Sequence, residues 1–298
     1  MFKKKKIFIF NIFIISYFLL TSVGFAGSQM KIGLSGDLVM LDPQLAQTGL
    51  DWTPAALIWN RLVEYDNTMM DPIPSIAESW QVSEDGKAWI FKIRKGITFH
   101  SGRELTSADV VYSFQRGFEI GAKGRFAGYM VSVDSYKALS PYEFQVSLKQ
   151  VDVTFLANLA VQSASIVDKD TIDKIRTEPI GSGPYEFVEW SPGEKTVYRK
   201  NKKYWDQKKL SEIPDEIITI PIPEEQTRLA NLQSGQVDMI NDVENVFWSQ
   251  IENDSNLRLW GQDVTASYKA VIFSFEKPPF KGNKLLRQAI AHAINKEA

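Results

Sequence analysis

The clearest alternation of hydrophobic and polar positions lies in the stretch from Pro72 to Arg116. Trp89, Phe91 and Ile93 occupy every second position within it, which predicts a strand with one buried face. The run Glu84–Gly86 stands before these residues, and its Asp-Gly pair is typical of a tight turn. The pattern therefore predicts a turn that leads into a half-buried strand.

A helix is predicted shortly after this strand. Thr106 stands three residues before Asp109, which is the spacing of a capping box with Asp in place of the usual Glu. Val110 and Phe114 follow at helical spacing and predict its buried face. Further along, the segment Tyr142–Leu148 alternates as cleanly as the first strand. We therefore expect a largely antiparallel sheet with one face in the core.

Strands and helices alternate along the rest of the chain. One helix is predicted to begin at Asp51 or Thr53, with Pro54 in its first turn, and another to begin at Pro223. This alternation predicts βαβ-like units around a mixed sheet, and therefore an α/β fold. The other predicted strands are Lys31–Ser35, Tyr185–Trp190, Glu216–Ile220, Val237–Ile240 and Tyr268–Phe275, and the other predicted helices are Phe155–Val161, Asp168–Arg176 and Leu285–Ile294.

The N-terminus has the features of an export signal. A basic start at Lys3–Lys6 precedes the apolar run Ile7–Leu20, and small residues stand at Gly24 and Ala26. This order predicts a signal peptide over residues 1–26 that is cleaved after Ala26. A retained membrane anchor is the alternative, but the apolar run is shorter than the ~20 residues that a spanning helix needs.

Composition narrows the class of protein further. The chain contains no cysteine, which excludes disulfides, thiolate metal sites, cysteine nucleophiles and a lipid-anchored lipoprotein. We therefore expect a periplasmic protein without a lipid anchor, whose stability comes from its hydrophobic core and not from disulfides. Removal of residues 1–26 takes away four Lys and leaves 30 basic against 36 acidic residues. This acidic balance argues against a nucleic-acid partner, which would require a basic surface.

Several motifs together resemble the signature of one family, the large extracytoplasmic solute-binding proteins that serve peptide and nickel ABC importers. In that family a Trp precedes an acid-Asp-Gly turn, and an aromatic strand, an Arg-Lys-Gly break, a Phe-His-x-Gly loop and a Thr-x-x-Asp-Val helix start follow. The matching positions here are Leu41-Asp42-Pro43, Trp80, Glu84–Gly86, Arg94–Gly96, Phe99–Gly102, Thr106–Val110, Gly181–Tyr185 and Asn201–Trp205.

The resemblance implies an α/β fold of the periplasmic binding protein-like type, class II, cluster C, with mixed sheets. It implies that residues 27–65 and 180–270 form a discontinuous first lobe and that residues 66–179 form an inserted accessory domain. Residues 271–298 would begin a second large lobe that is mostly missing. The implied function is that of a monomeric, non-enzymatic periplasmic receptor without a cofactor, which captures small peptides and delivers them to ABC permease subunits.

Two stretches are candidates for the ligand site. Ala46, Gln47, Thr48 and Gly49 correspond to backbone that in the family lies beside an extended ligand, and peptides are held largely through main-chain hydrogen bonds. The second stretch contains Lys123, Arg125 and Phe126. There Arg125 could pair with a carboxylate of a peptide or of a metal chelator, with Phe126 stacking on the ligand. An ordinary surface loop is the alternative for both stretches, and Trp52 and Trp59 are expected in the core.

Other functions remain open. One rival is a receptor for nickel or another metal chelate, and another is a truncated fragment that does not bind ligand and has an interaction or chaperone-like role. His100 and His292 are the two histidines of the chain, too few for a metal site built from side chains. Gly181 and Gly183 lack the following Lys-Ser or Lys-Thr of a phosphate-binding loop. With one lobe mostly missing, residues 27–298 are expected to hold a ligand only with a dissociation constant of roughly 1 mM.

Overall fold

The structure is a computed structural model, which describes residues 28–66, 71–259, 276 and 278–293. The chain divides into two compact units between Ser249 and Gln250, and each unit is described by itself. The predicted signal peptide, residues 1–26, and the predicted strand Tyr268–Phe275 lie outside the described residues.

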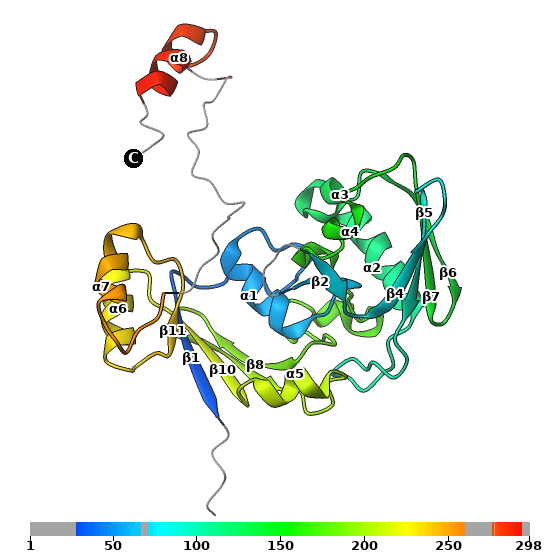
Figure 1. Cartoon of the computed structure of the whole chain (residues 1–298), viewed down its shortest axis with the longest axis horizontal. Helices are drawn as coiled ribbons and strands as arrows, with labels where there is room; N and C mark the ends of the chain where they lie inside the picture. The colour runs from blue at the N-terminus through cyan, green and yellow to red at the C-terminus, as the bar shows by residue number, and fades with distance from the viewer. Residues whose placement is uncertain (1–27, 67–70, 260–275, 277, 294–298) are drawn as a thin grey trace, which may run out of the picture. The chain divides into compact units, whose positions relative to one another are not determined.

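The first unit contains a five-stranded mixed sheet in the order β11-β1-β10-β9-β8 (Figure 1). Its elements are β1 (Gln29–Leu34), β8 (Tyr185–Ser191), β9 (Lys195–Lys200), β10 (Glu216–Pro221), α6 (Glu225–Gln233) and β11 (Met239–Ile240). Strand β1 runs parallel to both neighbours, whereas β9 runs antiparallel to β10 and β8. Because β1 lies between β10 and β11, the connection through α6 is a βαβ crossover. The predicted mixed sheet is confirmed.

A second, antiparallel sheet has the order β4-β5-β7-β6. Its strands are β4 (Ala77–Val82), β5 (Ala88–Ile93), β6 (Val133–Ser140) and β7 (Glu143–Leu148). The predicted turn is confirmed, since Gly86 has a φ of 71° and donates its N–H to Ser83 O at 2.9 Å. Phe91 and Ile93 are buried on one face, as predicted. A two-stranded ribbon of β2 (Val63–Tyr65) and β3 (Pro72–Pro74) precedes this sheet.

The helix predicted after β5 is present as α2 (Ser107–Ile120). The N–H of Thr106 donates to the carboxylate of Asp109 at 2.9 Å, which satisfies a backbone donor that the helix start leaves free. Val110 and Phe114 are buried as predicted. The shorter helices of the first unit are η1 (Gly121–Lys123), α3 (Phe126–Tyr129), α4 (Phe155–Asn158), η2 (Gln162–Ala164), η3 (Lys169–Lys174), α5 (Gln207–Glu212) and η4 (Asn245–Phe247).

The first helix, α1 (Gly49–Ile58), begins earlier than predicted. The expected start was Asp51 or Thr53, but Thr48 caps the helix by accepting a hydrogen bond from the N–H of Asp51 at 3.3 Å. In return, the carboxylate of Asp51 accepts the N–H of Thr48 at 3.2 Å. With this reciprocal capping box the helix begins two residues before Asp51 and four before Thr53. Thr48 and Gly49 therefore belong to a helix start and not to an irregular loop.

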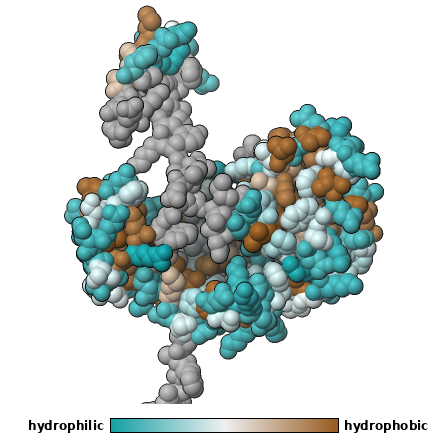
Figure 2. Space-filling model, in the orientation of Figure 1, coloured by the Kyte–Doolittle hydropathy of each residue, from teal (hydrophilic) through white to brown (hydrophobic). Residues whose placement is uncertain are grey.

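Two hydrophobic clusters form the core of the first unit. One lies on the antiparallel sheet and α2, and includes Phe91, Phe114 and Phe144. The other lies between α1 and the mixed sheet, and includes Trp59 and Tyr198. Figure 2 shows apolar side chains also gathering on the surface over the region of α3, α4 and β5, at the right of the view. The domain boundaries after residues 65 and 179 stay a prediction.

The second unit is described for residues 250–259, 276 and 278–293. Helix α7 (Trp248–Glu252) crosses the division between the units, and α8 (Lys284–Ala293) lies within the second. The side chain of Asn283 accepts the N–H of Leu286 at 3.0 Å and so caps the start of α8. The predicted C-terminal helix is confirmed.

Candidate functional site

The loop before α1 is organised by one buried carboxylate. Asp51, which is 2% exposed, accepts the backbone N–H groups of Val39 at 2.8 Å, Met40 at 3.0 Å and Gln47 at 3.3 Å. Burial alone would raise the pKa of Asp51, but the hydrogen bonds from Val39, Thr48 and Met40 outweigh it and lower that pKa. The first candidate stretch, residues 46–49, is therefore held in a fixed conformation.

A buried ion pair attaches this loop to α2. Asp42, which is 0% exposed, accepts the guanidinium of Arg116 at 2.5 Å. The side chain of Gln44 accepts from Arg116 at 2.6 Å and donates to Ser113 O at 2.8 Å. Since Asp42 belongs to the Leu-Asp-Pro motif, the motif has a structural role: it fixes the loop to α2.

The two candidate stretches, 78 residues apart in the sequence, meet in the structure. The side chain of Gln47 donates to Lys123 O at 2.9 Å, and Arg125 donates from Nη2 to Gln47 O at 2.9 Å. Between them, Gly124 lies against the loop so closely that a Cβ there would be 2.4 Å from Gln44 O. This close approach explains the glycine at this position.

Phe126 does not fit its predicted role. Its ring is 1% exposed and packs edge-on against Phe114 at 5.1 Å and Phe118 at 5.2 Å between ring centroids. A Cβ at Gly117 would lie 2.4 Å from the ring, so the glycine makes room for it. Phe126 is a core residue and cannot stack on a ligand. Ala46 is also buried, at 2% exposed, so that its side chain cannot contact a ligand either.

The exposed aromatic ring beside Arg125 is that of Trp52 and not that of Phe126. It was predicted to be in the core, as Trp59 is, but it is 39% exposed. The guanidinium of Arg125 lies over its ring at 5.9 Å from the centroid. The buried residues of α1 are Asp51, Pro54, Ala55 and Ile58, which places Trp52 on another face of the helix. A correct helix start would have revealed this face from the sequence.

An open hollow lies beside Arg125. Its volume is about 600 Å³, and Arg125, Ala127, Tyr129 and three glycines line it. At Gly128 a Cβ would meet no atom within 4 Å, so the space in front of this residue is empty. The hollow is within the size range of small-molecule sites in proteins, roughly 300–1,000 Å³. A backbone loop, a cation, an aromatic ring and a hollow thus lie together.

His100 has a structural position, not a catalytic one. Its Nε2 lies 3.0 Å from Gly183 O, and its Nδ1 accepts the N–H of Gly181 at 3.3 Å. The neutral imidazole with a proton on Nε2 satisfies both contacts. Burial lowers the pKa of His100, although the Gly183 carbonyl and Glu186 act in the opposite direction. The imidazole therefore joins the residue 97–102 turn to the start of β8.

We expect this arrangement to make stability depend on pH. Because the folded pKa of His100 is below its ordinary value of 6.5, the unfolded chain takes up a proton first. Stability is fully present above pH 6.5 and is lost as the pH falls through the folded pKa. Urea unfolding between about pH 7.5 and pH 5.5 should show this loss, at no more than about 1.4 kcal/mol per pH unit.

The variant His100→Gln should remove this part of the pH dependence, whereas His292→Gln should leave it unchanged because His292 is exposed. An identical pH profile for His100→Gln and the natural chain would show that other groups are responsible.

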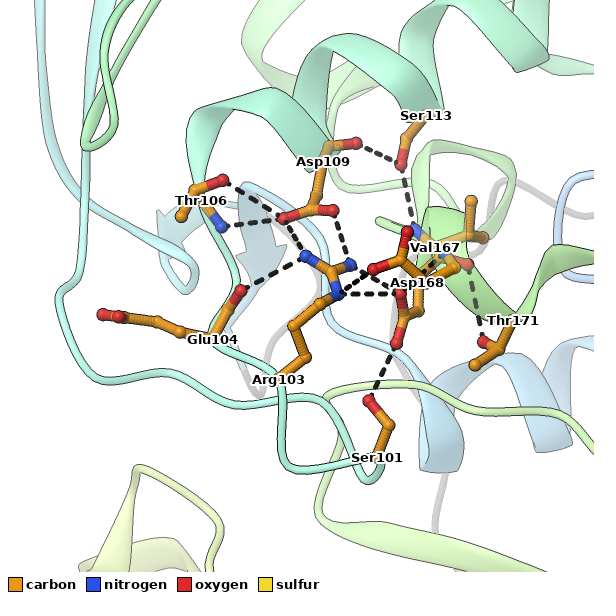
Figure 3. Close-up of polar contacts among 10 residues, drawn as sticks. Ser101, Arg103, Glu104, Thr106, Asp109, Ser113, Val167, Asp168 and Thr171 are labelled. Atoms are coloured by element: carbon orange, nitrogen blue, oxygen red, sulfur yellow. Dashed lines mark hydrogen bonds and ion pairs between the residues drawn. The ribbon is translucent and has the colours of Figure 1, made fainter.

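A second polar cluster lies around Arg103 (Figure 3). Its guanidinium lies 2.6 Å from Asp109 and 2.5 Å from Asp168, whose carboxylates are both 0% exposed. Burial lowers the pKa of Arg103, but the two carboxylates outweigh it and raise that pKa overall. Asp168 also accepts from Ser101 at 2.9 Å. One guanidinium is thus shared by two buried carboxylates, and these ion pairs join α2 to η3.

Among the described residues, no group of three or more His, Cys, Asp or Glu could hold a metal ion. Within the same residues, no helix has both the length and the apolar character for crossing a membrane.

A family model and similar proteins both agree with the family resemblance seen in the sequence motifs. Residues 71–298 match the model of the bacterial extracellular solute-binding proteins, family 5 Middle. The chain is 30% identical to heme-binding protein A of Haemophilus influenzae, over 81% of this chain and 48% of that protein. It is 28% identical to the dipeptide-binding protein of Escherichia coli, over 86% of this chain and 52% of that protein.

Solved structures of similar proteins have the same fold over the matched region. The DppA protein of Helicobacter pylori, in complex with the peptide STSA, has a TM-score of 0.69 and 27% identity and covers 77% of this chain. HbpA2 of Haemophilus parasuis has a TM-score of 0.70 and 25% identity and covers 76% of this chain. The matched regions are 49% and 50% of those two chains. The chain therefore spans about half the length of the relatives that it matches, and the predicted periplasmic binding protein fold is confirmed over that half.

Proposed function

Since this chain belongs to family 5 of the bacterial extracellular solute-binding proteins, we propose that it is the substrate-binding component of an ABC importer. It captures small peptides and delivers them to the membrane permease. Support for peptides comes from the similar proteins, because one is named a dipeptide-binding protein and another was solved with the peptide STSA. In this proposal the chain acts as a monomer in the periplasm after removal of residues 1–26.

The observation that supports a ligand site most strongly is the meeting of residues 46–49 with Lys123 and Arg125. The loop is fixed by Asp51 and attached to Lys123 and Arg125 by two hydrogen bonds of 2.9 Å. Lys123 and Arg125 are exposed and form no ion pair with the residues that the structure describes. A preformed loop beside two available cations suits an extended ligand that carries a carboxylate.

A titration of residues 27–298 with dipeptides tests this function. We expect saturable binding with dissociation constants of roughly 1 mM or below, because a preformed loop and a charge-assisted contact with the ligand carboxylate both favour binding. The signals of the tryptophan indole N–H groups in NMR spectra would measure binding, since Trp52 is partly exposed at the site.

Arg125→Gln should weaken binding, and Lys174→Gln, at an exposed position away from the site, should not. No shift of the indole signals at peptide concentrations about tenfold above this range would contradict the proposal. Mass spectrometry of the purified chain adds a second readout. A co-purifying metal chelate or haem in place of peptides would show that the ligand class is different.

A further inference from the structure

The guanidinium of Arg125 is held on one side and available on the other. Nη2 donates to Gln47 O at 2.9 Å, and the ring of Trp52 lies 5.9 Å from the guanidinium carbon. Within the described part of the chain, no carboxylate lies within ion-pair distance of Arg125. Arginine presents five N–H donors in a planar fork. The remaining donors can therefore receive a carboxylate without rearrangement of the side chain.

Charge decides which end of a peptide this position accepts. Lys123 and Arg125 are both exposed cations, whereas Asp51 in the neighbouring loop is 2% exposed and already accepts hydrogen bonds from that loop. The positive potential would repel the amino terminus of a peptide and attract its carboxylate. A peptide oriented in this way places its last side chain next to Arg125, where the hollow lies.

The hollow suits an apolar side chain of the ligand better than a second charged group. Its lining residues other than Arg125 are uncharged, namely Gly121, Gly124, Ala127, Gly128 and Tyr129. A Cβ at Gly121 or Gly128 would meet no atom within 4 Å, so these two glycines leave the space empty, and Tyr129 adds an aromatic wall. An apolar side chain that enters such a space loses contact with water, which favours binding.

From this arrangement we infer that Arg125, positioned by Trp52, binds the C-terminal carboxylate of a short peptide, and that the hollow receives the last side chain of that peptide. The inference rests on the proposed function and deepens it, because it states how the peptide is oriented and which peptides are preferred. Free-acid peptides with a large apolar last residue bind best, and C-terminally blocked peptides bind poorly.

Filling the hollow tests the second half of the inference. Gly128 has no positive φ, and a side chain there would enter empty space, so Gly128→Leu should fold normally. We expect it to weaken binding of Ala-Leu by about tenfold and to leave Ala-Gly within about twofold, as measured by the tryptophan indole shifts. Equal effects on the two peptides, or no effect on either, would overturn the assignment of the hollow.

Blocking the carboxylate tests the first half. Ala-Leu amide should bind about tenfold more weakly than Ala-Leu, and Arg125→Gln should remove this difference. Trp52→Ala should reduce the difference, whereas Trp52→Phe should keep most of it, because a phenyl ring also attracts the guanidinium. For these two variants the backbone amide signals of residues 46–49 measure binding, since the Trp52 indole is absent. If acid and amide bind equally to the natural chain, the orientation is wrong although the chain binds peptides. If neither peptide binds, the proposed function itself fails.

Discussion

Replacement of Arg103 by methionine is expected to lower the free energy of unfolding by about 3–5 kcal/mol. Its guanidinium lies 2.6 Å from Asp109 and 2.5 Å from Asp168, and both carboxylates are 0% exposed. Removal of the cation leaves two buried negative charges without their partner. Methionine keeps much of the apolar part of the side chain, which lies over the ring of Phe99, so the lost charge should dominate the effect.

Urea unfolding of Arg103→Met at neutral pH measures this loss. Lys174→Met is the matched control, because it removes a Lys–Glu pair whose side chains are 64% and 69% exposed. Such exposed pairs contribute little, about 0.2–1 kcal/mol. A loss below about 1 kcal/mol for Arg103→Met would mean that water replaces the guanidinium and that the two carboxylates are not dependent on it.

Replacement of Phe114 by alanine is expected to cost a similar amount, about 3–5 kcal/mol, because it opens a cavity in the larger core. Phe114 is 1% exposed and contacts three rings, with centroid distances of 5.0 Å to Phe144, 5.1 Å to Phe126 and 5.4 Å to Tyr136. These contacts join α2 to β6, β7 and α3. The loss therefore affects four elements at once.

The chemical denaturation midpoint and its slope distinguish this effect from a change in the unfolded state. Phe114→Leu should cost less than Phe114→Ala, because it keeps most of the buried volume. Val153→Ala serves as the surface control, since Val153 is 92% exposed and should change stability by less than about 0.5 kcal/mol. A loss for Phe114→Ala that is no larger than that of the control would show that the core is misassigned.

The sequence allowed correct predictions where a residue's environment is set by its near neighbours. The turn at Gly86 needs a positive φ, and the alternation of β5 follows from its one buried face, so both can be recognised locally. The same is true of the start of α2, because Thr106 and Asp109 satisfy each other across a single turn. The mixed order of the larger sheet also followed, since strand-helix-strand patterns impose a parallel crossover.

The candidate site could be predicted only in part, because its residues depend on contacts across long separations. Residues 46–49 and 123–126 were identified, but the role of each side chain was not. Phe126 is buried because Gly117 leaves room for its ring, and Trp52 is exposed because α1 begins at Gly49. The residues beside Phe126 do not show the first reason, whereas the capping-box spacing of Thr48 and Asp51 indicates the start of α1. Likewise, nothing near Arg103 in the sequence indicates its second partner, Asp168, 65 residues away.

The parallel pairing of β1 with β10 has a consequence for the order of folding. The hydrogen bond between Gln29 and Glu216 joins residues 187 positions apart. The loss of chain entropy on closing so long a loop costs about 2–3 kcal/mol more free energy than the same loss on closing a tight hairpin such as that of β4 and β5. The antiparallel sheet is therefore expected to fold first. Once it has folded, the N–H of Gly183 can bond to Ile58 O, and this contact shortens the gap that β1 and β10 must close.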